Sequence, residues 1–173
     1  MLYEGTGVSE YTKELVLHLL KSGTNHSYVL FLSTPHLHLK EKIASFFREH
    51  AQKTQYMIKT VPIPPKILEF LWNRLHVLPV EWLIGQVDVF FSSDWVEPPT
   101  LKAGKVTTIH DLTVLKMPEL FDSYIVSVHR RKLAWVAKES AMIFCDSRAT
   151  KRDVETLLHI SSSRLRVVYP GVR

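Results

Sequence analysis

The chain has 173 residues, of which 46% are apolar and 23% charged, with 22 Lys and Arg against 17 Asp and Glu. This composition excludes a disordered tail, which is poor in apolar residues, and a collagen-like chain, which needs far more than 6 glycines. The single cysteine, Cys145, cannot form an internal disulfide or a thiolate zinc cage, so we expect a reducing, cytoplasmic location and no metal. No apolar run approaches the roughly 18 residues that cross a bilayer, so neither a membrane span nor a leader peptide is predicted.

Helical and strand patterns alternate along the chain. Apolar residues at steps of three and four indicate amphipathic helices, and short apolar runs rich in β-branched and aromatic residues indicate buried strands. In chain order, the predicted elements are a helix over 8–21, a strand over 28–32, a helix over 39–51, a strand over 55–61, a proline-rich turn over 62–65, a helix over 66–84, strands over 87–92 and 105–109, a helix whose apolar face runs from Ile125 to Ala137, a strand over 141–145, a helix over 148–159 and a strand over 165–169. Pro79 should break the third helix, Ser147 should cap the last one, and residues 94–104 and 110–122 are predicted as loops.

This alternation predicts an α/β, Rossmann-like fold, because a parallel strand pair needs a crossover that is usually a helix. We expect a three-layer sandwich with a mostly parallel sheet and helices on both faces. Residues 1–168 are expected to form one domain whose first strand is missing before Gly5. Residues 169–173, which carry a Pro-Gly turn, are expected to begin a linker to a further domain.

Loops that follow strands deserve the most attention, because ligands of parallel α/β sheets bind outside the carboxyl ends of the strands. The turn that opens the first predicted helix contains Gly5, Gly7 and Val8. Two glycines let backbone N–H groups approach an anion, and the helix directs the positive end of its dipole to the same place. These three residues are therefore candidates for ligand binding, with a plain tight turn as the alternative.

Two further loops carry polar side chains at strand ends. His110 and Asp111 follow the strand over 105–109, and a histidine there can hydrogen-bond a sugar hydroxyl or move a proton. Ser147 follows the strand over 141–145, where it can cap a helix, bind a ligand oxygen, or do both. A structural role for His110 is the alternative to a catalytic one.

Asp94 and Trp95 follow the strand over 87–92 and place a carboxylate and an aromatic ring in one loop. The ring can stack on a sugar face or pack within the protein, and the sequence leaves both open. Residues 129–173 carry a net charge of +6, against −1 for residues 1–128. This excess suits a phosphate-bearing ligand or peripheral contact with an anionic membrane, with a solvated helix face as the alternative. No recognition-helix pattern accompanies the charge, so nucleic-acid binding is not expected.

Five motifs follow one another in a fixed order. They are GTGVSEYTKEL at 5–15, VDVFFS at 87–92, TIHDL at 108–112 with PELF at 118–121, DSRATKRD at 146–153, and RVVYPGV at 166–172. Together they resemble the N-terminal domain of family 4 glycosyltransferases of the GT-B fold, also called group 1, which include many mannosyltransferases. No single motif is specific, but their order and spacing are.

The resemblance implies the acceptor-side half of a two-domain enzyme, whose C-terminal domain would bind the donor. The implied reaction moves a hexose, mannose or glucose, from a nucleotide-diphosphate sugar to a glycan or lipid-linked acceptor, with retention at the anomeric carbon and without an obligatory metal or other cofactor. Gly7 and Val8 would lie by the donor diphosphate and the acceptor, His110 of the His110-Asp111 pair would face the transferred sugar, and Ser147 would line the cleft. The chain alone would be inactive.

A different class of function remains open on the same residues. The chain could be a stand-alone, non-catalytic α/β module that binds a phosphorylated ligand or a partner protein at the strand-end crevice. A parallel α/β fold does not decide between these two interpretations, because function depends on the site.

Overall fold

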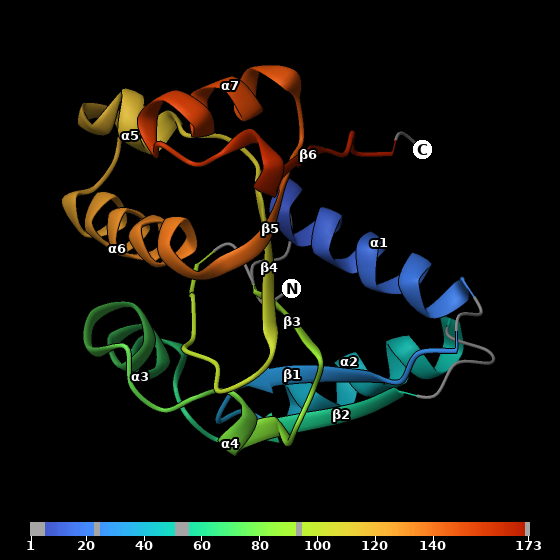
Figure 1. The fold of residues 1–173 in the computed structure, drawn as a ribbon. Helices are drawn as coiled ribbons and strands as arrows, with labels where there is room; N and C mark the ends of the chain where they lie inside the picture. Colours follow the sequence, from blue (N-terminus) through green and yellow to red (C-terminus); the bar gives the residue numbers. More distant parts are fainter. Residues whose placement is uncertain (1–5, 23–24, 51–55, 93–94, 172–173) are drawn as a thin grey trace. The chain divides into compact units, whose positions relative to one another are not determined.

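The computed structural model describes residues 6–22, 25–50, 56–92 and 95–171. The chain divides into two compact units, residues 1–67 and residues 68–173, which we call unit 1 and unit 2. Figure 1 shows the elements of both in chain order. Gly5, Asp94 and the last two residues lie outside the described residues, and so does the place where the missing first strand was expected.

Unit 1 is built on a parallel β-α-β arrangement. Helix α1 (Gly7–Lys21) precedes strand β1 (Tyr28–Ser33), helix α2 (Leu37–His50) and strand β2 (Tyr56–Val61). The two strands pair in parallel, from Tyr28 opposite Tyr56 to Ser33 opposite Val61. Leu17 and Leu20 of α1 and Phe47 of α2 form its buried core, so the apolar faces predicted from periodicity are the faces that pack.

Unit 2 contains a four-stranded parallel sheet. Its strands are β3 (Val89–Ser92), β4 (Gly104–Ile109), β5 (Ser140–Cys145) and β6 (Leu165–Val167), and they pair in the order β3-β4-β5-β6. The order in the sheet therefore follows the order in the chain. The core lies where this sheet meets its helices; it contains Ile109, Leu112, Leu133, Val136, Ile143, Cys145, Val154, Ile160 and Leu165.

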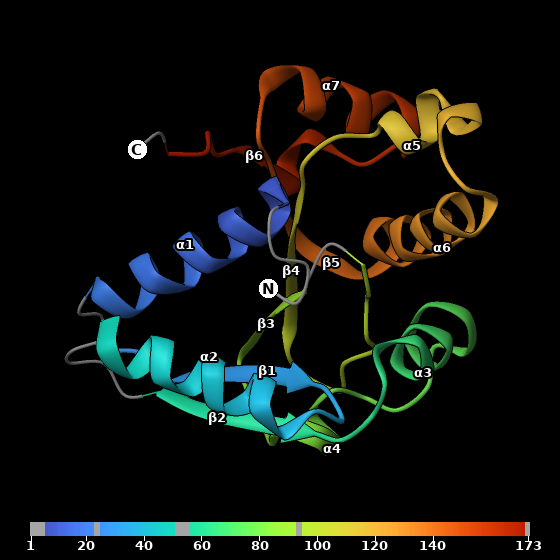
Figure 2. The same cartoon turned by 180° about the vertical axis from the view of Figure 1, so that it is seen from behind.

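The helices of unit 2 differ widely in length. They are α3 (Pro65–Glu69, which begins in unit 1), the π-helix η1 (Phe70–Leu75), α4 (Glu81–Ile84), α5 (Thr113–Lys116), the 3₁₀ turn η2 (Pro118–Leu120), α6 (Ser123–Glu139), α7 (Arg148–Leu157) and the 3₁₀ turn η3 (Ser162–Arg164). Right-handed crossovers between strands that follow one another across a sheet place their helices on one side. Figures 1 and 2 show α6 and α7 on the same side of the four strands.

The predicted α/β class with parallel strands is confirmed. The structure differs from the sequence analysis in three places. The strands form two sheets where one was expected. The third predicted helix is interrupted over 76–80, around Pro79 as expected, but the interruption already begins at His76, which adopts a left-handed φ of 53°. The predicted loop over 110–122 contains α5 and η2.

The structure divides the chain into two compact units. That residues 1–168 act as a single domain stays a prediction. Among the residues that the structure describes, no helix is both long and apolar enough to cross a membrane.

Candidate functional site

Three loops of unit 2 leave the same edge of its sheet. Strands β3, β4 and β5 are parallel neighbours, so their carboxyl ends lie side by side. Ile109, the last residue of β4, is opposite Cys145, the last residue of β5. The next residues, His110 and Asp146, therefore emerge next to each other at the edge where ligands of such sheets bind.

His110 and Asp146 are in direct contact. Nδ1 of His110 lies 2.6 Å from Oδ2 of Asp146, and the two side chains are 17% and 20% exposed. An oxygen–nitrogen distance this short is typical of a charge-assisted hydrogen bond. His110, predicted as a site residue, thus has a carboxylate partner that comes from the neighbouring strand.

The other predicted member of the histidine pair, Asp111, has a different contact. Its Oδ1 accepts the backbone N–H of Thr113 at 2.7 Å, and the side chain is exposed. This geometry is the Asx turn that aspartate favours at the start of a short helix, here α5. The catalytic role of Asp111 stays a prediction. The contact that the structure describes for its side chain is the hydrogen bond of this turn.

Ser147 caps α7, as predicted. Its Oγ accepts the backbone N–H of Thr150 at 3.0 Å, and the Thr150 hydroxyl donates to the backbone oxygen of His110 at 3.0 Å. The first turn of α7 therefore holds the backbone of His110. Ser147 is half-buried, and its predicted contact with a ligand remains untested beside the cap.

The loop after β3 is tied to the protein interior. The Trp95 ring lies against the His129 ring, with centroids 4.9 Å apart, and the Trp95 backbone oxygen accepts from Nδ2 of Asn73 at 2.8 Å. Two residues on, Glu97 is 0% exposed. The packing alternative for Trp95 thus has a named partner, whereas its stacking on a sugar stays a prediction.

Beneath this loop lies a buried ionic cluster of four side chains. Nζ of Lys105, which is 2% exposed, lies 3.4 Å from Oε1 of Glu97 and 2.5 Å from Oε2 of Glu139, and Glu139 also contacts Nε2 of His76 at 3.0 Å. Burial alone would raise the pKa of Glu139, but the hydrogen bonds and charges of Lys105 and His76 outweigh it, so the pKa is lowered. The cluster joins η1, β4 and α6 and is part of the scaffold.

Gly7 and Val8 belong to unit 1, at the start of α1. The Thr6 hydroxyl accepts the backbone N–H of Ser9 at 3.2 Å, which caps the helix. A Cβ at Gly7 would meet no atom of the described residues within 4 Å, and Gly7 has no left-handed φ, so neither crowding by those residues nor the backbone angle requires glycine there. The predicted approach of an anion remains open at Gly7 and Val8.

The basic segment at the start of the +6 region is less exposed than the sequence suggests. Lys132 is 1% exposed and donates to the Thr107 hydroxyl at 3.4 Å, and Arg131 binds Glu69 at 3.3 Å. Arg130 is the exposed member of the three. The alternative of a solvated basic face therefore does not describe Lys132, and contact with an anionic membrane stays a prediction.

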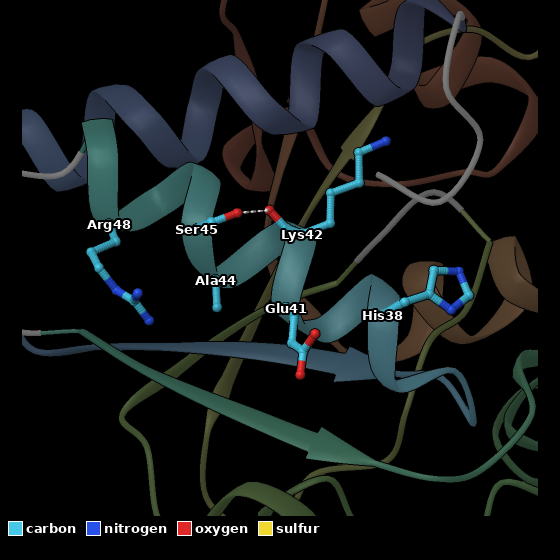
Figure 3. A pocket seen from close by; sticks show the side chains of 6 residues that line it. All are labelled: His38, Glu41, Lys42, Ala44, Ser45 and Arg48. Carbon is cyan, nitrogen blue, oxygen red and sulfur yellow. Dashed lines mark hydrogen bonds between the residues drawn. The ribbon is translucent and has the colours of Figure 1, made fainter.

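One hollow of about 600 Å³ lies along α2 in unit 1 (Figure 3). Its lining consists of six residues of that helix: His38, Glu41, Lys42, Ala44, Ser45 and Arg48. Figure 3 shows Glu41 and Arg48 on one side of the helix and Lys42 on another, with the Ser45 hydroxyl bound to the backbone of Lys42. Among the described residues, one helix provides all its walls and no predicted site residue lines it, so we do not take this hollow as the site.

A family model described as Glycosyltransferase Family 4 matches residues 5–173. The chain belongs to glycosyltransferase family 4. Comparisons with curated proteins and with solved structures give no match. The match covers both units of this glycosyltransferase domain and all five motifs noted in the sequence.

Sequence reasoning missed two features of the glycosyltransferase domain. Asp146 stands beside Ser147 in the sequence, yet its pairing with His110 depends on the register between β4 and β5. The signal that could have found it is its position: His110 and Asp146 are each the first residue after neighbouring parallel strands. The ionic cluster had no such signal, because its members come from four separate segments. Among the described residues, no group of three or more His, Cys, Asp or Glu could hold a metal ion.

Proposed function

We propose that this glycosyltransferase domain is the acceptor-side half of a retaining enzyme. The reaction moves a hexose, mannose or glucose, from a nucleotide-diphosphate sugar to a hydroxyl of a glycan or lipid-linked acceptor. The bond from the acceptor oxygen to the anomeric carbon forms, the bond from that carbon to the diphosphate breaks, and the hydroxyl proton leaves with the released nucleotide diphosphate or to solvent. Neither a metal nor another cofactor is required in this proposal; stabilisation of the leaving group is electrostatic.

The observation that carries the proposal is the place of His110. Its side chain is partly exposed at the carboxyl edge of β4, where ligands of parallel α/β sheets bind, and the family match supports glycosyltransferase activity in general. In the proposal, the imidazole of His110 hydrogen-bonds a hydroxyl of the transferred sugar, and Ser147, in the loop after the neighbouring strand, lines the cleft. Gly7 and Val8 are assigned to the diphosphate and acceptor by resemblance.

We expect the chain alone to transfer no sugar, because the resemblance implies that the donor-binding residues belong to a second domain. The test therefore joins the chain, by fusion or co-expression, to a donor-side domain of the same family. Transfer of labelled hexose from UDP-glucose or GDP-mannose to a glycan or polyprenyl-phosphate acceptor is then measured.

The decisive variant is His110→Ala, which should lower kcat/KM by about 10- to 100-fold, the equivalent of one strong hydrogen bond in the transition state. His159→Asn is the matched control: His159 is exposed, and asparagine tolerates its left-handed φ of 53°. Full activity of His110→Ala would refute the role of His110. Binding of a sugar phosphate without transfer from either donor would favour the stand-alone binding module.

A further inference from the structure

Asp146 provides an unusual contact at the carboxyl edge of unit 2. Its Oδ2 binds Nδ1 of His110 at 2.6 Å, while its Oδ1 is buried and makes no hydrogen bond with the described residues. A carboxylate oxygen buried without a donor is costly. The side chain does not cap α7, since Ser147 does so. The one hydrogen bond described for the Asp146 side chain is therefore directed at the imidazole.

That contact determines which ring nitrogen carries the proton. An ionised carboxylate can only accept hydrogen bonds, so Nδ1 of His110 must be the donor. In a neutral imidazole the other nitrogen, Nε2, is then the acceptor. A free neutral imidazole in a peptide prefers the opposite tautomer, with the proton on Nε2, so Asp146 reverses the preference of the ring.

The backbone of His110 is held by the same short segment that carries Asp146. The Thr150 hydroxyl donates to the His110 backbone oxygen at 3.0 Å, and Ser147 holds the Thr150 backbone N–H at 3.0 Å. The ring is thus fixed through Nδ1 and the main chain is fixed through its carbonyl, both by the residues around the start of α7. Such double support is what keeps a reacting group within the narrow geometry that catalysis needs.

We infer that Asp146 is a positioning residue that makes Nε2 of His110 a hydrogen-bond acceptor for a hydroxyl of the bound sugar. The role of the hydroxyl rests on the proposed function; the effect of Asp146 on the ring does not. Asp146 acts through His110 and touches no reacting atom itself. Its removal keeps the support of the His110 main chain by Thr150 and changes which ring nitrogen can accept a hydrogen bond.

The first test observes the ring directly in the 173-residue chain. Long-range ¹H–¹⁵N correlation spectra at pH 8.5, where neutral imidazoles dominate, distinguish the two tautomers, and the His110 signals are those lost in His110→Gln. We expect the proton on Nδ1 in the unmodified chain and a shift toward Nε2 in Asp146→Ala. Asp111→Asn is the control: its side chain keeps the acceptor for Thr113, and the His110 tautomer should not change.

Asp146→Asn, which preserves the side-chain volume, replaces Asp146→Ala if the alanine variant does not fold. Its amide can donate to Nδ1, so it should also move the proton toward Nε2. A proton on Nε2 in the unmodified chain, or on Nδ1 in both variants, would overturn the inference.

The second test uses the chain joined to the donor-side domain. Asp146→Ala should lower kcat about 10- to 100-fold with little change in KM, and the double variant with His110→Ala should be no worse than His110→Ala alone, since Asp146 acts through His110. Additive losses would overturn the inference. If the tautomer changes but both single variants keep full transfer, the proposed role of His110 fails and the catalytic use of the pair fails with it. If the tautomer does not change while His110→Ala loses activity, the inference alone fails.

Discussion

At the scale of single residues, Glu81 shows how one carboxylate can fix a loop. Its buried Oε1 accepts three successive backbone N–H groups, from Leu101, Lys102 and Ala103, at 2.8, 3.0 and 3.1 Å. Burial alone would raise the pKa of this carboxyl, but the backbone donors outweigh burial and the pKa is lowered from its ordinary value near 4.5. The ionised form of Glu81 is therefore the one that holds the segment leading into β4.

This contact makes stability depend on pH in a defined direction. A carboxyl whose folded pKa lies below its unfolded pKa stabilises the protein above about pH 4.5, and the contribution disappears as the pH falls through the folded pKa. Glu81→Gln should therefore lower the free energy of unfolding by about 1–3 kcal/mol at pH 7 and by progressively less below pH 4.5. Urea unfolding across this range tests it, with the exposed Glu119→Gln as control. A deficit that stays constant with pH would contradict the prediction.

Cys145 lies at the end of β5, fully buried beside the candidate site. Burial, with a further contribution from the charge of Asp146, raises the pKa of its thiol to about 11. Because the thiolate is the reactive form, we expect the native protein to react with a disulfide reagent at pH 8 far more slowly than glutathione does, and the urea-unfolded protein to react at once. Complete labelling of the native chain within seconds would show that the thiol is accessible.

Site residues were predictable to the extent that strand ends are predictable. The β-branched run before His110 and the apolar run before Ser147 locate both residues at the ligand-binding edge. The partner of His110 was not predictable in the same way, because Asp111 is adjacent in the sequence whereas Asp146 is adjacent only across the paired strands. A sequence pattern shows whether a residue lies at the end of its strand. It does not give the register between strands, so it does not tell which residue of the next strand lies opposite.

At the scale of elements, the ionic cluster around Lys105 joins η1, β4 and α6. The ammonium group of Lys105 in β4 meets Glu97 in the preceding loop and Glu139 at the end of α6, and it donates to the Pro98 backbone oxygen at 3.0 Å. Ser92 at the end of β3 donates its hydroxyl to Glu97 at 2.5 Å. One buried cation thus balances carboxylates from two segments that flank the sheet.

Removal of the Lys105 ammonium group should therefore destabilise the fold strongly. Lys105→Met leaves the fully buried Glu97 without a positive neighbour in the cluster, and we expect a loss of about 3–5 kcal/mol in the free energy of unfolding, measured in urea. Lys105→Met combined with Glu97→Gln should recover part of the loss, since the uncompensated charge is then absent. The idea fails if Lys105→Met is within about 1 kcal/mol of the unmodified protein.

Most regular elements were predicted well because each shows a period or a run of apolar, β-branched residues. The strands over 28–32 and 105–109 and the Ser147 cap agree with the structure within one or two residues. The π-helix η1 and its end were missed, since His76 ends it through long-range contacts: its ring stacks on Trp135 at 3.5 Å and binds Glu139. Helix α5 and the turn η2 have only 4 and 3 residues, too few for a periodic signal.

At the scale of the whole molecule, the sequence predicted the fold class better than it predicted the placement of charge. The regular alternation of helix and strand predicted a parallel α/β architecture, and the structure confirms it. The +6 of residues 129–173 predicted a positive surface, but part of this charge serves the interior. Arg164 binds the backbone oxygens of Val136, Ala137 and Ser140 at the end of α6, at 3.2, 2.8 and 2.9 Å. Composition gives the number of charged residues but does not tell which of them are exposed and which bind groups within the protein.

The order β3-β4-β5-β6 in unit 2 has a consequence for how the domain is made. β4, β5 and β6 each pair with the strand synthesised just before them, so each finds its partner already present. Pairing between successive strands also keeps the closed loops short, which lowers their entropic cost. The growing sheet exposes one new edge at a time, and the last short strand covers β5, where the backbone N–H of Val168 binds the Cys145 oxygen at 3.0 Å. The contacts of Asp146 and Thr150 with His110 can therefore form once the start of α7 has followed β5, before β6 is made.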